Sequence, residues 1–209
     1  MEERWPFWGR RAVAAVAPGP GGAFTAATAY APRVDDQYPG ISRGEFDQLP
    51  VAFILHGSRS TQRLNTTHQE YEGTARYAVN EPDGFGWNAT VGEDEIAVHM
   101  PWTQWGWHAR RQSTRMIGLE FAQPNLGDPI SDAQVRAAAW GILEARRATQ
   151  ERFGEPVPFT FYTHAEVEAF GWTGMHDGKT DTHSFPDKRG AEDLKSRILQ
   201  RLRALGQPV

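Results

Sequence analysis

The sequence predicts a single α/β domain in which a central mixed β-sheet is flanked by helices. Three continuous apolar runs are typical of buried strands, and stretches with helical periodicity separate them. Each run contains or leads into a residue whose side chain can do chemistry, namely His56, Glu120 and His164. Because folds of this class collect functional groups at one end of their strands, we expect a site at that edge of the sheet.

Composition narrows the class of protein. The chain has 209 residues, of which 39% are hydrophobic and 23% charged, as in an ordinary globular domain. The net charge of −4 gives no sign of the basic face that nucleic-acid binders usually carry. The chain has 0 cysteines, which excludes disulfides and thiolate metal sites. No apolar stretch approaches the ~20 residues of a membrane-spanning helix, so neither nucleic acid nor membrane is an expected partner.

The first part of the chain differs from the rest. Residues 1–40 are rich in Ala, Gly and Pro without a sustained period, which predicts an irregular N-terminal arm ahead of a domain at 41–209. Arg10 and Arg11 precede an apolar run at 12–17, but this run is short for the apolar core of a signal peptide, and Pro and Gly residues end it. We therefore expect no clear signal peptide and synthesis in the cytoplasm.

Local patterns predict the elements of the first half of the domain. Ser42 and Glu45 have the spacing of a capping box and predict a short helical turn or loop. The helix that begins at residue 66 has Tyr71, Ala75 and Ala78 on one face, with Thr67 and Glu70 as its capping box. The predicted elements are, in order, a turn at 41–46, a strand at 51–55, a helix at 66–80, and strands at 87–91 and 95–100 joined by a tight turn.

An aromatic cluster follows at residues 102–110, where Trp102, Trp105 and Trp107 stand close to His108. Such a cluster lines a groove or plugs the end of a sheet, and the sequence leaves both possibilities open.

The next apolar strand, at 116–122, contains Glu120. A carboxylate in a buried strand is costly unless it is paired or linked to a metal. A salt bridge to an arginine and a role in chemistry are the two explanations.

The second half of the domain is more regular. Ser131 or Asp132 caps a long helix, which Gly154 ends. The predicted elements are a helix at 131–153, a strand at 159–163 leading into His164, a glycine-rich loop at 171–181, and a final amphipathic helix from Asp187 or Ala191 to Leu205, with Leu194, Ile198 and Leu202 on one face.

Residues far apart in the chain have the chemistry of a zinc site. A catalytic zinc takes three nitrogen or oxygen ligands and keeps one position open, and His56, His164 and Asp181 meet this description. Glu120 would accept the proton of the attacking water and pass it to a leaving amine, while Lys179 would stabilise the developing oxyanion. The helical His-Glu-x-x-His motif of the commonest zinc peptidases does not occur in the sequence.

Taken together, the motifs resemble those of the type 2 N-acetylmuramoyl-L-alanine amidases. The resemblance covers about residues 50–190, and the segments that give it are Leu55-His56-Gly57, Trp107-His108-Ala109, Ile117-Gly118-Leu119-Glu120, Thr163-His164 and Lys179-Thr180-Asp181. The family includes phage endolysins, cytosolic recycling amidases and peptidoglycan-recognition proteins. The resemblance implies a mixed sheet, one Zn²⁺ per chain held by His56, His164 and Asp181, and catalysis by Glu120 and Lys179. It also implies cleavage of the amide between N-acetylmuramic acid and L-alanine.

The sequence departs from the family in two places. Trp87 stands where several members have a catalytic tyrosine, and since an indole N–H does not exchange protons, Glu120 would carry that role. The segment at 165–178 is longer than usual, so His176 or His183 competes with Asp181 as third ligand. The residues expected to bind substrate are Trp87, Asn88, Trp107 and His108.

Three functions fit these residues. The first is a lytic, endolysin-type enzyme that acts on the cell wall. The alternatives are a cytosolic amidase that recycles muropeptides and a peptidoglycan-recognition protein without catalysis. In each case the expected partner is peptidoglycan or a muropeptide, and the chain is expected to be a monomer.

Overall fold

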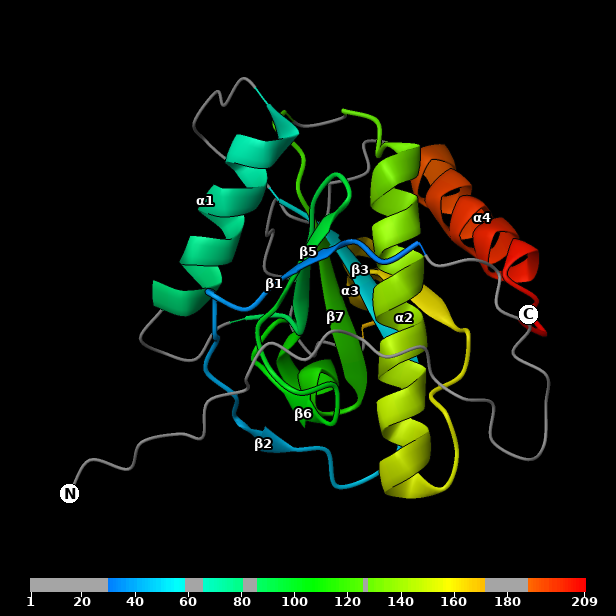
Figure 1. Cartoon of the computed structure of the whole chain (residues 1–209). Helices are drawn as coiled ribbons and strands as arrows, with labels where there is room; N and C mark the ends of the chain where they lie inside the picture. The colour runs from blue at the N-terminus through cyan, green and yellow to red at the C-terminus, as the bar shows by residue number, and fades with distance from the viewer. Residues whose placement is uncertain (1–29, 59–65, 81–85, 126–127, 172–187) are drawn as a thin grey trace.

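The structure is a computed structural model that describes residues 30–58, 66–80, 86–125, 128–171 and 188–209, with the backbone alone at 188–192. In these ranges six strands form one sheet in the order β1-β5-β4-β7-β3-β8, and β2 and β6 form a separate two-stranded sheet. Helices flank the six-stranded sheet (Figure 1). The predicted fold class is therefore confirmed.

The strands are β1 (Arg33–Asp35), β2 (Gly44–Glu45), β3 (Ala52–Gly57), β4 (Ala89–Val91), β5 (Glu95–Val98), β6 (Gln104–Trp105), β7 (Met116–Phe121) and β8 (Phe161–Thr163). The helices are α1 (Thr67–Asn80), the 3₁₀ turn η1 (Arg110–Thr114), α2 (Asp132–Phe153), α3 (His164–Ala169) and α4 (Lys188–Ala204). The pairings β1–β5, β4–β7, β7–β3 and β3–β8 are parallel. The pairing β4–β5 is antiparallel, which makes the sheet mixed.

The two faces of β3 pack against different helices. Successive side chains of a strand point to opposite faces, so Phe53 and Leu55 face one side, while Ile54 and His56 face the other. Phe53 and Leu55 belong to the largest buried cluster, which also contains the apolar residues of α2 and α4. Figure 1 shows α4 lying alongside α2 over that face.

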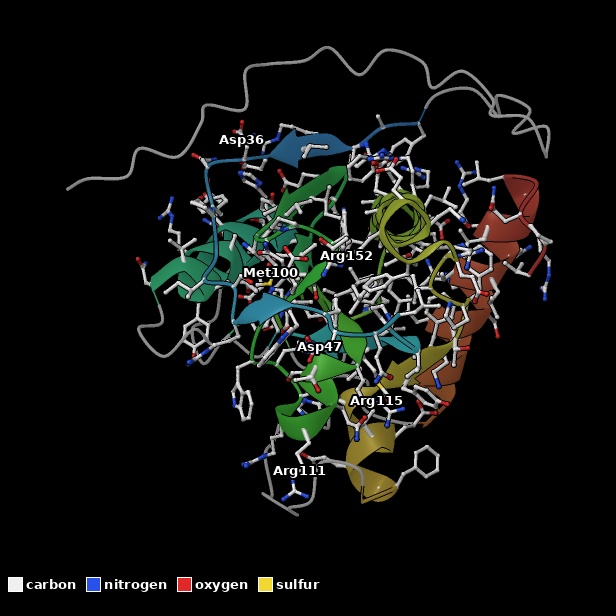
Figure 2. The ribbon with its side chains drawn as sticks, turned by 90° about the horizontal axis from the view of Figure 1, so that it is seen from below. Asp36, Asp47, Met100, Arg111, Arg115 and Arg152 are labelled. Carbon is white, nitrogen blue, oxygen red and sulfur yellow. The ribbon has the colours of Figure 1, made fainter. Side chains whose placement is uncertain are left out.

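The opposite face is covered by three smaller elements. Tyr71 and Ala75 of α1 pack against Ala97 of β5. Val167 of α3 packs in a cluster with Ile54 of β3. In Figure 2, which looks along α2, Arg111 of η1 lies on the far side of the sheet from that helix. His56 therefore points to the face that α1, α3 and η1 cover.

The caps of α2 are those that the sequence predicts. The Ser131 hydroxyl accepts a hydrogen bond from the backbone N–H of Gln134, and the Gln134 side chain accepts one from the Ser131 N–H. Gly154 ends the helix in the left-handed conformation, with φ of 80°. Next to this end, Arg152 of α2 forms an ion pair with Glu45 of β2 (3.2 Å), and both Arg152 and α2 are visible in Figure 2.

The structure corrects three local predictions. Arg33–Asp35, expected to be irregular, forms β1 because its backbone pairs with β5. The predicted turn at 41–46 is wrong over Gly44–Glu45, which pairs with β6 as β2. The cap of α1 is Thr66, whose Oγ1 accepts from the N–H of Gln69, and not Thr67. The division into an arm at 1–40 and a domain at 41–209 stays a prediction, since residues 1–29 lie outside the described ranges.

None of the helices in the described part of the chain combines the length and the apolar composition that crossing a bilayer requires.

Ile142 tests the packing of α2 on the sheet, because its side chain is fully buried in the main cluster. Ile142→Ala should lower the free energy of unfolding by about 2–5 kcal/mol, and Ile142→Val by about 0.5–1.5 kcal/mol. Urea denaturation measures both. Arg147→Ala, on the exposed side of α2, should stay within about 0.5 kcal/mol of the unsubstituted chain. Equal effects of Ile142→Ala and Arg147→Ala would contradict this packing.

Candidate active site at the ends of the parallel strands

Four side chains form a row across neighbouring strands of the sheet. Thr90 of β4 is the register partner of Glu120 of β7, and Glu120 is in turn the partner of His56 of β3. Residues paired in this way point to the same face, about 5 Å apart. His164 continues the row, since it follows Thr163, whose neighbour Leu55 precedes His56. The sheet therefore brings together His56, Glu120 and His164, as the sequence predicts.

The two histidines of this row are in ring contact. The ring centroids of His56 and His164 lie 4.9 Å apart, edge to face. Both side chains are buried. Burial, with the neighbouring His164 and His108 adding to it, holds the pKa of His56 well below its usual value, so its ring is neutral. A neutral imidazole is the form that binds a metal.

The positions of α3 and β8 follow from a capping motif. Thr163 accepts a hydrogen bond from the N–H of Glu166, and the Glu166 carboxylate accepts one from the N–H of Thr163. This capping box starts α3 at His164, a helix that we do not predict from the sequence. One turn later, the Glu168 carboxylate lies 3.7 Å from Nε2 of His164.

His108 is joined to His56. Its Nδ1 lies 3.0 Å from Nε2 of His56, and its Nε2 lies 3.2 Å from the carbonyl oxygen of Met116. The side chain is only 3% exposed. Burial lowers the pKa of His108 to about 3, so this ring too is neutral. The contact with substrate that we expect of His108 stays a prediction. The structure adds that its ring contacts His56 and the Met116 carbonyl inside the protein.

Another buried histidine, His99, is linked to Trp87 through hydrogen bonds to Thr90. Nδ1 of His99 donates to the carbonyl oxygen of Tyr38 (2.8 Å), so its Nε2 accepts from the Thr90 hydroxyl (2.8 Å). The Thr90 oxygen in turn accepts from Nε1–H of Trp87 (2.7 Å). The indole N–H is thereby used inside the protein. Burial lowers the pKa of His99 to about 4.

Asn88 connects three strands. Its Nδ2 donates to the carbonyl oxygen of Gln104 (2.7 Å), and its Oδ1 accepts from the backbone N–H of Gly118 (3.0 Å). The residue is 0% exposed. Its expected contact with substrate stays a prediction.

The three tryptophans of the aromatic cluster at 102–110 differ in exposure. Each of the two possibilities that the sequence leaves open therefore fits part of the cluster. Trp102 is buried and Trp105 partly buried against the main core. Trp107 is 41% exposed, and its ring centroid lies 6.4 Å from that of Trp105. Trp107 directly precedes His108 in the chain, and its ring is the exposed one of the three tryptophans.

The remaining predicted residues lie outside the described ranges, namely Lys179, Asp181, His176 and His183. Within the described ranges, no group of three or more His, Cys, Asp or Glu side chains is arranged to hold a metal ion. His56 and His164 nevertheless supply two buried nitrogen donors that fit zinc, and the expected third donor is Asp181.

Three supporting residues are not found by sequence reasoning. His99 and Thr90 sit in ordinary strand patterns and give no signal. Gly118 does give one, because a glycine inside an apolar strand often marks a close approach. A Cβ at Gly118 would lie 2.9 Å from Nδ1 of His108, so the missing side chain makes room for that ring.

Comparisons with known proteins bear on the family and the fold. The sequence profile described as N-acetylmuramoyl-L-alanine amidase matches residues 48–183. No curated protein sequence matches the chain significantly. Among solved structures, a mutant endolysin from Bacillus subtilis is similar with a TM-score of 0.51 and 19% identity, covering 79% of this chain and 98% of its own.

A second similar structure is the Staphylococcus aureus hydrolase AmiA in complex with its ligand, with a TM-score of 0.53 and 18% identity, covering 84% of this chain and 86% of its own. At these identities the likeness shows the fold.

Asn88→Ala would leave the buried Gly118 N–H and the partly buried Gln104 carbonyl without this partner. We expect the free energy of unfolding to fall by about 1–3 kcal/mol, measured by urea denaturation. Unchanged stability together with a raised KM would instead assign Asn88 to substrate binding.

His99 gives a pH dependence. Its pKa is about 4 in the folded protein and about 6.5 in the unfolded chain. Between these values the unfolded chain binds more protons, so His99 makes stability fall as the pH decreases from about 6.5 to about 4, by up to about 1.4 kcal/mol per pH unit.

In His99→Asn the slope should be smaller over that window and unchanged above it. Denaturation at several pH values compares the two proteins, and parallel profiles would show that His99 is not held neutral.

Proposed function

We propose that this chain, which belongs to the N-acetylmuramoyl-L-alanine amidase family, is a zinc-dependent enzyme that cleaves peptidoglycan. The bond cleaved is the amide between the lactyl group of N-acetylmuramic acid and the L-alanine of the stem peptide. The observation that supports this most is the position of His56, between the register partner Glu120 and the ring of His164.

His56, His164 and Asp181 would hold the zinc. Two buried imidazoles and one carboxylate make a donor set that suits Zn²⁺ and leaves a position for water. When bound, zinc acts as a Lewis acid towards the substrate carbonyl and lowers the pKa of water towards ~7.

Glu120 would act as the general base and then as the general acid. Its carboxylate takes a proton from the water that attacks the carbonyl carbon, and it delivers that proton to the nitrogen as the C–N bond breaks. The products are the lactyl carboxylic acid and the free amino terminus of L-alanine. Lys179 would stabilise the negative charge that develops on the carbonyl oxygen. Trp87 cannot share this proton transfer, because its N–H is bonded to Thr90.

Trp107 is the most suitable of the predicted substrate-binding residues to meet a glycan. An exposed indole offers a flat apolar surface, and this one is the neighbour of His108. Trp87, Asn88 and His108 complete the predicted set, and their side chains are buried. We place the enzyme in the lytic class, which acts on the cell wall. Faster release from soluble muropeptides than from intact sacculi would support the recycling function instead.

The test is Glu120→Gln, assayed on purified peptidoglycan by mass spectrometry of the products. We expect release of L-alanine amino termini to fall by about 10²–10⁴-fold in kcat, because the general base is lost. A chelator should abolish the activity of the unsubstituted chain, and zinc should restore it.

Glu144→Gln is the matched control, since Glu144 is ion-paired with Arg147 on the surface of α2. It should retain full activity. Cleavage elsewhere in the peptidoglycan, or activity that a chelator leaves unchanged, would overturn the proposal. A folded protein that binds zinc but releases no amino termini would support the recognition function.

A further inference from the structure

We propose that His108 is a positioning residue that fixes His56 in one tautomer, with the proton on Nε2 and the lone pair of Nδ1 directed to the metal. The inference rests on the proposed function, because it assigns His108 a role toward the zinc that His56 would bind. It concerns a residue whose ring is enclosed by the protein, and which the amidase chemistry does not itself require.

His56, His108 and the Met116 carbonyl form a series of two hydrogen bonds. The direction of both bonds follows from the carbonyl at its end. The Met116 carbonyl oxygen can only accept, so Nε2 of His108 carries the proton that it donates there. A neutral imidazole has one N–H, so Nδ1 of His108 is an acceptor. Nε2 of His56 faces that acceptor at 3.0 Å and must therefore be the donor. The lone pair of His56 is left on Nδ1.

The two nitrogens of His108 meet different partners, namely a carbonyl oxygen that can only accept and an imidazole that can donate. The ring is only 3% exposed and lies against both His56 and Gly118 of β7. The tautomer is therefore set by the carbonyl group and not by the solvent.

The position of His108 is built by several contacts. The Ser113 hydroxyl oxygen accepts hydrogen bonds from the backbone N–H groups of His108 (3.0 Å) and Ala109 (2.7 Å), which fixes the backbone at the start of η1. Ser113 is itself fully buried. On the other side the ring lies against Gly118, where a Cβ would come within 3.0 Å of three ring atoms. Together these contacts keep Nδ1 of His108 directed towards His56.

Partners of this kind are known to affect metal binding. A group that bonds to the second nitrogen of a ligating histidine orients the ring and raises its basicity, and its loss typically costs 10–100-fold in affinity. His164 has a comparable neighbour, since Glu168 lies 3.7 Å from its Nε2. The two histidines thus differ in kind, because one faces a carboxylate and the other a neutral ring.

The first experiment needs no substitution and no metal. Two-bond ¹H–¹⁵N spectra of the zinc-free, unsubstituted chain report which nitrogen of each imidazole carries the proton. We expect the Nε2–H tautomer for both His56 and His108. Finding His56 with its proton on Nδ1, or His108 with its proton on Nδ1, would overturn the inference whether or not the chain binds zinc.

The second experiment measures zinc affinity by competition with a chromophoric chelator. His108→Leu keeps a similar volume but removes the acceptor, and we expect affinity to fall by about 10–100-fold. His108→Asn places an amide oxygen near the position of Nδ1 and should recover most of that loss. His68→Leu, at an exposed histidine of α1, is the matched control and should bind zinc like the unsubstituted chain.

The outcomes separate the two proposals. If the unsubstituted chain binds no zinc, the proposed function fails, and the NMR result still decides the tautomer. If it binds zinc and folded His108→Leu binds equally tightly, the role of His108 is overturned while the function stands. Equal weakness of His108→Asn and His108→Leu, both folded, would also overturn it, because the shape of the ring and not its acceptor would then matter.

Discussion

The parallel pairing of β3 with β7 is the constraint on which the site depends. It sets His56 and Glu120 as neighbours on one face, and the pairing of β3 with β8 delivers His164 to the same edge. The backbone pairing of the strands fixes these positions. A shift of one residue in the register of β3 would turn His56 to the opposite face, where α2 and α4 cover the sheet. The large apolar cluster under α2 and α4 therefore also secures the geometry of the polar face.

That polar face contains buried imidazoles without charge. His56, His99 and His108 are all enclosed, and burial lowers the pKa of each. Two of them donate a hydrogen bond to a backbone carbonyl, His99 to that of Tyr38 and His108 to that of Met116. A carbonyl acceptor fixes which nitrogen of a neutral imidazole carries the proton, and it introduces no charge. The face thus combines burial with fixed hydrogen-bond donors and acceptors.

Much of this arrangement could be predicted from the sequence, because apolar runs and caps are local signals. The strands that place His56 and Glu120, and an N-cap of α2 at Ser131 or Asp132, need no tertiary information. The family indicated by the motifs is confirmed by the profile match over residues 48–183. Two of the missed elements depend on distant partners: Arg33–Asp35 and Gly44–Glu45 are strands only because β5 and β6 lie beside them. The contact between His108 and His56 joins residues 52 positions apart, and no spacing rule indicates it. The roles assigned to His56, Glu120 and His164 stay predictions.

The close approach of the His108 ring to Gly118 links two positions in the course of divergence. While the histidine is present, any side chain at 118 would compete with it for the same volume. Once a smaller residue replaces the histidine, position 118 no longer has to be glycine, and the methyl group of an alanine can fill the space. Aligned relatives should therefore show histidine and glycine retained or exchanged together at these two positions. Such paired variation would record an internal packing requirement, and it would be misread if glycine 118 were taken for a residue that contacts substrate.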